Sequence, residues 1–81
     1  MKIEEWLTGD IKYDSLGQFI TCNNGKNRIC DIRGWGAISH KFKDMEEADK
    51  FQDSVGEFIV LAIKEKLQKI QDEKRSVFVH N

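Results

Sequence analysis

The chain has 81 residues, with 13 basic and 14 acidic side chains and a formal net charge of −1. This balance predicts no general attraction to nucleic acid or to an anionic membrane. A chain of this length forms one small domain with a marginal core, and its longest apolar run, residues 58–63, is far shorter than the ~20 residues that span a bilayer.

The first ten residues, MKIEEWLTGD, contain two glutamates and no apolar run. We therefore expect no secretory signal and a soluble protein of the cytoplasm. Residues 3–7 fit either a strand or one turn of helix. Residues 10–14 alternate as a strand does, and residues 14–17 have the composition of a turn.

The clearest local signal is Asn24-Gly25, which lies between two segments of β-forming residues. This dipeptide favours a two-residue hairpin turn because both central positions need positive φ. In that register Cys22 pairs with Asn27, Ile20 with Ile29, and Phe19 with Cys30. The two thiols then lie on opposite faces of the sheet, which excludes a disulfide between them and agrees with a reducing compartment.

Residues 35–39 are a candidate for a further strand. The first half of the chain, residues 1–43, is thus predicted to form an antiparallel meander of three to four strands. A long helix is predicted over 44–76, with Asp44 as its N-cap and Glu47 three residues later, followed by a tail at 77–81. The predicted fold class is α+β, in a single domain of residues 1–81.

The helix carries two apolar stripes at helical spacing. One is formed by Ala48, Phe51, Val55, Phe58 and Ala62, and the other by Ile59, Ile63, Leu67 and Ile70. Because residues 58–63 are apolar all round, one sheet cannot cover them, and we expect a homo-oligomer, first of all a dimer. The alternative is that the N-terminal segment, with Ile3, Trp6 and Leu7, or the tail at 77–79 folds back over this segment. The residues expected to associate are Val55, Gly56, Ile59, Val60, Ile63 and Leu67, with Gly56 allowing close backbone approach.

Enzymatic motifs are weak. Cys30, His40 and Asp31 have the residue types of a thiol enzyme, and Asp72-Glu73-Lys74 has those of a nuclease, but two isolated cysteines are usually small core residues. The cysteines and histidines lack the spacing of a metal site. We expect no catalytic residues, no metal and no cofactor.

A corner follows the hairpin, in the sequence Asp-Ile-Arg-Gly-Trp-Gly of residues 31–36. Trp35 between two glycines fits either a cover for the end of the core or one part of a binding site. An indole beside cationic groups suits a nucleotide or an acidic protein surface. The candidate binding residues are Arg33, Trp35, His40, Lys41 and Lys43.

Residues 28–63, with RICDIRGWGAIS followed by EEADKFQDSVGEFIVLAI, resemble small proteins encoded by bacteriophages and prophages. The resemblance implies an accessory role inside the host cell, with interference in host defence as the expected activity. The function predicted from the sequence is thus a small non-enzymatic binding protein that occupies a host protein. The alternatives are a nucleotide-binding sponge that uses Arg33 and Trp35, and a small thiol enzyme or nuclease.

Overall fold

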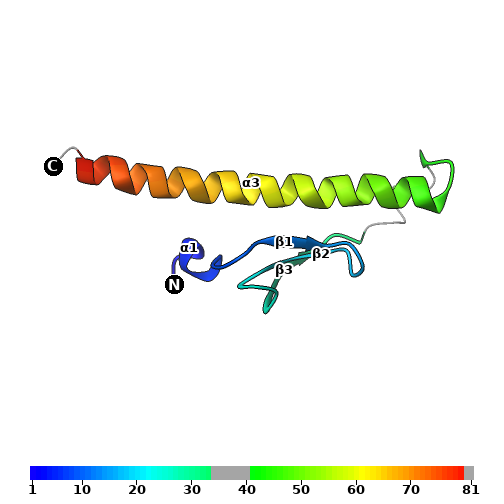
Figure 1. Ribbon diagram of the computed structural model, residues 1–81, viewed down its shortest axis with the longest axis horizontal. Coiled ribbons are helices and arrows are strands. Elements are labelled where there is room, and N and C mark those ends of the chain that lie inside the picture. Colours follow the sequence, from blue (N-terminus) through cyan, green and yellow to red (C-terminus); the bar gives the residue numbers. More distant parts are fainter. Residues whose placement is uncertain (34–40, 80–81) are drawn as a thin grey trace.

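The fold consists of a small antiparallel sheet and one long helix that lies along it (Figure 1). The computed structural model describes residues 1–33 and 41–79, the last four as backbone only. In chain order the elements are α1 (Ile3–Trp6), β1 (Lys12–Asp14), β2 (Phe19–Cys22), β3 (Asn27–Asp31) and α3 (Met45–Val79). The strands pair in the order β1-β2-β3, which confirms the predicted α+β fold.

The N-terminal segment forms a short helix, and a side-chain cap holds the turn that follows β1. Residues 3–6 are helical, which decides between the two structures that the sequence left open. The turn after β1 is held by Asp14, whose Oδ1 accepts from the backbone N–H groups of Leu16 at 2.9 Å and Gly17 at 3.2 Å. The turn at 14–17 is confirmed, and β1 occupies three of the five residues predicted for its strand.

The β2–β3 turn has the predicted central residues. Asn24 and Gly25 have φ values of 56° and 90°, and the backbone N–H of Lys26 donates to the carbonyl of Asn23 at 3.1 Å. Cys22 pairs with Asn27, as predicted. Positive φ at both central positions is the geometry that Asn-Gly adopts with little strain.

Further along the hairpin the predicted register is wrong. A bulge between Ile20 and Thr21 shifts the pairing, so that Ile20 lies opposite Cys30 and Phe19 opposite Asp31. The extra residue in β3 is Ile29. Ile20 and Cys22 share a face because side chains alternate along a strand, so both thiols lie on the same face and not on opposite ones. Both cysteines are free, Cys22 buried and Cys30 half-buried.

The start of α3 is capped as expected. The Asp44 side chain accepts from the backbone N–H of Glu47 at 2.9 Å, while the Glu47 carboxylate accepts from the N–H of Lys43 at 3.1 Å. The helix continues to Val79, so residues 77–79, predicted as a tail, are helical. The predicted strand at residues 35–39 lies outside the described residues.

The core lies between the sheet and α3. Its buried hydrophobic members are Ile11, Ile20, Cys22, Ala48 and Val60. On α3 the buried positions are spaced by four residues: Ala48, Gln52, Gly56 and Val60. The predicted stripe that contains Phe51 and Phe58 is split, since Ala48 is buried whereas these two residues are 45% and 72% exposed.

One of these buried positions is a glycine because an aromatic ring occupies the space beside it. The ring of Tyr13 on β1 lies against Gly56, where an added Cβ would be 2.6 Å from its Cγ. The Tyr13 hydroxyl donates to Asp53 Oδ1 at 2.9 Å. Burial and this bond to the carboxylate raise the pKa of Tyr13 to about 12. Gly56 therefore permits close approach, but to the sheet and not to a second helix.

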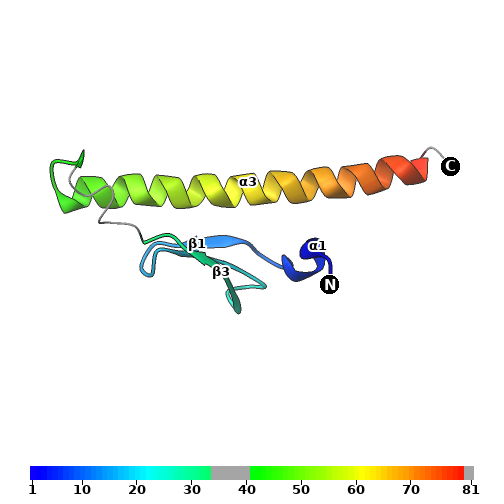
Figure 2. The same cartoon turned by 180° about the vertical axis from the view of Figure 1, so that it is seen from behind.

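The molecule is elongated. Its extents are 57 × 23 × 16 Å and its radius of gyration is 16.1 Å, against the ~12 Å expected of a compact domain of this length. A helix of 35 residues is about 52 Å long. Figure 2 shows that the sheet and α1 lie under only part of α3, and that the C-terminal end of α3 extends past α1.

Candidate functional site

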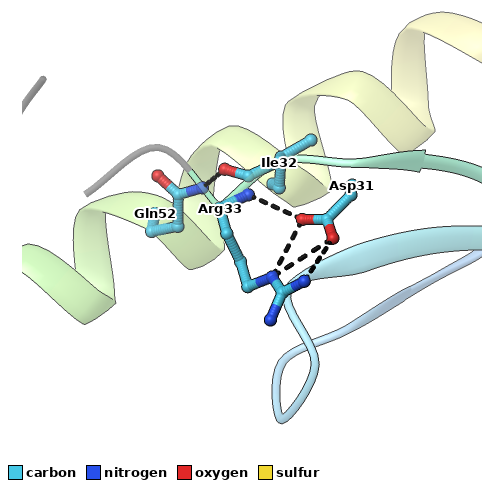
Figure 3. A network of polar contacts seen from close by, with 4 residues as sticks. All are labelled: Asp31, Ile32, Arg33 and Gln52. Atoms are coloured by element: carbon cyan, nitrogen blue, oxygen red, sulfur yellow. Dashed lines mark hydrogen bonds and ion pairs between the residues drawn. The ribbon is translucent and has the colours of Figure 1, made fainter. Parts of the chain in front are cut away.

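The end of β3 holds the first candidate binding residue. The Arg33 guanidinium donates from Nη2 to Asp31 Oδ2 at 2.7 Å and from Nε to both carboxylate oxygens at 3.1 Å (Figure 3). The Arg33 backbone N–H donates to Asp31 Oδ1 at 3.0 Å. These side-chain and backbone bonds lower the pKa of Asp31 to about 2. The cation that the sequence offers to a ligand is thus already paired with a carboxylate.

Ile32, which precedes Arg33, connects this end of the sheet to α3 through a hydrogen bond. The Gln52 side-chain amide donates to the carbonyl oxygen of Ile32 (Figure 3), and the N–H of Ile32 donates to the carbonyl of Gln18 at 3.0 Å. Gln52 is buried, and a buried amide normally requires such a partner. Gln52 therefore fixes where the chain leaves the sheet.

The rest of the predicted binding corner is described only in part. Lys41 and Lys43 are exposed, whereas Trp35 and His40 lie outside the described residues. Phe42, between the two lysines, contacts Phe51 with ring centroids 5.1 Å apart. This contact anchors the segment that enters α3. With Trp35 and His40 outside the described residues, the binding corner stays a prediction.

The residues considered for thiol catalysis are described only in part. Cys30 is half-buried and Asp31 is paired with Arg33, whereas His40 lies outside the described residues. In the 72–74 triplet, Lys74 forms an ion pair with Glu4 at 3.2 Å. Within residues 1–33 and 41–79, no three His, Cys, Asp or Glu side chains come together as a metal ion requires.

A groove of about 420 Å³ runs between α1 and one flank of α3. Its lining consists of Ile3, Leu7, Phe58, Ile59, Ala62, Ile63, Lys66, Leu67 and Ile70. Lys66 is the single charged residue among them. We call this surface the α1–α3 groove. Such a concave apolar surface with one cationic group at its border is suited to binding an apolar partner.

Three of the six residues expected to self-associate line this groove, namely Ile59, Ile63 and Leu67. Gly56 and Val60 are buried toward the sheet, so they are not available to a partner, and Val55 is half-buried. Ile3 and Leu7, which the sequence offered as a cover for residues 58–63, lie beside α3 and line the groove. Sequence reasoning missed which side of the 58–63 segment stays open.

No family model, curated protein or solved structure matches this chain. Also, no helix in the described ranges combines the length and apolar character needed to cross a bilayer.

Proposed function

We propose that this chain is a non-enzymatic binding protein that acts by occupying a protein partner, and that its working surface is the α1–α3 groove. The observation that carries this proposal is the composition of the groove, in which eight of nine lining residues are apolar. A surface of this kind is costly to leave in water, and large exposed apolar patches usually mark interaction sites.

The chemistry of the groove favours an amphipathic helix as the partner segment. Helix-in-groove recognition places apolar side chains spaced by three and four residues against a hydrophobic channel. Ile59, Ile63 and Ile70 along α3 form one wall, and Ile3 and Leu7 form the other. The Lys66 ammonium can pair with an acidic residue at the border of such a helix.

The identity of the partner is supported only by the sequence of residues 28–63, which resembles bacteriophage accessory proteins. On that basis the partner is a host protein in the cytoplasm, and the consequence of binding is interference with host defence. No catalytic step is part of this proposal, since the protein acts by occupying its target.

Affinity capture from a bacterial host lysate tests the proposal when it is done with matched variants. Phe58→Asp places a charge in the groove at a largely exposed position, so the fold should survive. Leu16→Asp is the control, because Leu16 is 97% exposed on the turn after β1. The wild type and the Leu16 variant should retain a protein that the Phe58 variant loses. Equal capture by all three would refute the groove as the working surface.

A thermal-shift panel of nucleotides tests the alternative use of Arg33. Because Asp31 already holds the guanidinium, we expect no shift in melting temperature with any nucleotide. A shift that Arg33→Ala removes would favour the nucleotide sponge instead.

A further inference from the structure

We infer that the α1–α3 groove is closed by the same surface of a second copy of this chain, with the two α3 helices antiparallel. This inference rests on the proposed function, because it names an occupant of the same groove. A protein partner that uses the groove then competes with the second copy. Three observations lead to this occupant.

The first observation is the amount of surface. The chain exposes 6180 Å², whereas a folded monomer of 9.4 kDa is expected to expose about 5,000 Å². The excess of about 1,200 Å² is larger than the ~800 Å² that each partner buries in a standard interface. One additional copy therefore accounts for about two thirds of it.

The second observation is the position of the apolar segment. Residues 58–63 lie at the middle of α3, which runs from Met45 to Val79. A two-fold axis near residue 62 therefore places this segment of one copy against that of the other, and both helices overlap along their full length. Phe58, which is 72% exposed and borders the groove, then contacts the groove of the partner copy. The same patch serves both subunits, as two-fold symmetry requires.

The third observation is the charge distribution along α3, which selects the orientation. Residues 45–58 carry five acidic side chains and one lysine, and residues 64–75 carry five basic and three acidic ones. Antiparallel helices place the acidic half of one copy beside the basic half of the other. Parallel helices would place like charges together, which electrostatic complementarity disfavours.

Light scattering coupled to size exclusion tests the assembly on the full-length chain. The wild type should have twice the mass of one 9.4 kDa chain at micromolar concentration. Phe58→Asp should weaken the dimer about tenfold or more, as loss of a central aromatic contact usually does. Leu16→Asp should leave the mass unchanged, and so should Leu61→Asp, since Leu61 is on α3 but does not line the groove.

A wild type that stays monomeric would overturn the inference, as would a dimer that Leu61→Asp breaks and Phe58→Asp does not. Circular dichroism of each variant, showing an unchanged helix signal, establishes that a loss of mass reflects dissociation and not unfolding.

Cross-linking tests the orientation. Ser54→Cys and Lys69→Cys, each exposed and placed on either side of residue 62, are made in chains that also carry Cys30→Ala. Mixed and treated with a short bismaleimide, the two variants should cross-link to each other. Cross-links of each variant only to itself would indicate parallel helices and refute the antiparallel arrangement.

The proposed function and this inference fail in different ways. A monomer that captures a host protein through Phe58 refutes the second copy and leaves the binding function intact. A chain that neither dimerises nor loses a captured protein with Phe58→Asp refutes both.

Discussion

Replacing Gly56 with alanine tests how the long helix lies on the sheet. In α3 the backbone of Gly56 is helical, so alanine introduces no strain of its own. The new methyl group would instead be 2.5 Å from Tyr13 Cε1 and 2.6 Å from Cγ, much closer than van der Waals contact. The tyrosine ring must move, although its hydroxyl is bonded to Asp53 at 2.9 Å.

Two effects of opposite sign determine the result. Alanine is favoured over glycine inside a helix by about 1 kcal/mol. Overpacking a core costs about 1–3 kcal/mol, and displacing the ring also loses the Tyr13–Asp53 hydrogen bond, worth about 1 kcal/mol. The free energy of unfolding should therefore fall by about 1–3 kcal/mol, which lowers the melting temperature by roughly 4–8 °C per kcal/mol in a domain of this size.

The assay is urea and thermal denaturation followed by helical circular dichroism, with all variants at one protomer concentration, because association would stabilise the folded state. In a Tyr13→Ala background the obstacle is absent, so Gly56→Ala should stabilise by about 1 kcal/mol. If Gly56→Ala stabilises the chain with Tyr13 present, the contact between the ring and α3 is refuted.

Three further predictions concern single groups. Because the pKa of Tyr13 is raised to about 12, the contribution of its protonated hydroxyl to stability is complete below pH 10 and is lost as the pH rises from 10 to 12. In melting experiments at increasing pH, Tyr13→Phe should therefore lose less stability than the wild type, and an equal loss would contradict this. The pKa of Asp31 is lowered to about 2, so the contribution of its carboxylate to stability is present above pH 4 and decreases toward pH 2. Asp31→Asn should remove that part of the acid dependence of the melting temperature, and the same dependence in both chains would contradict the ion pair with Arg33. Asp44→Ala should lower the free energy of unfolding by about 1 kcal/mol through loss of the cap, with Asp44→Ser as the control that retains it.

The parts of the fold that were predicted correctly depend on neighbours in sequence. Asn24-Gly25 determines its own turn, and Asp44 caps the helix that begins at the next residue. Each uses a bond that spans at most three residues, such as Asp44 Oδ1 with the N–H of Glu47. Local signals of this kind can be read without knowing what lies beside them.

The parts that were missed depend on contacts between distant segments. The bulge at Ile29 reversed the expected face of Cys30, and no turn residue marks it. Apolar periodicity placed Phe51 and Phe58 in one stripe with Ala48, but it did not show which side of the helix faces the sheet. The helix carries a glycine at position 56 because the ring of Tyr13, about forty residues earlier in the chain, occupies that space. The sequence offered the N-terminal segment as one of several covers for residues 58–63, but it could not show that a groove remains between α1 and α3.

The short length of β1 limits how copies of this chain can meet. Among the described residues β1 forms one edge of the sheet, and an open edge can recruit a strand from another molecule. β1 has only three residues, and Lys12, which pairs with Asp10 at 3.3 Å, keeps a charge there. A short and charged edge is a poor template for strand addition. Fibril growth by strand addition at β1 is thereby disfavoured.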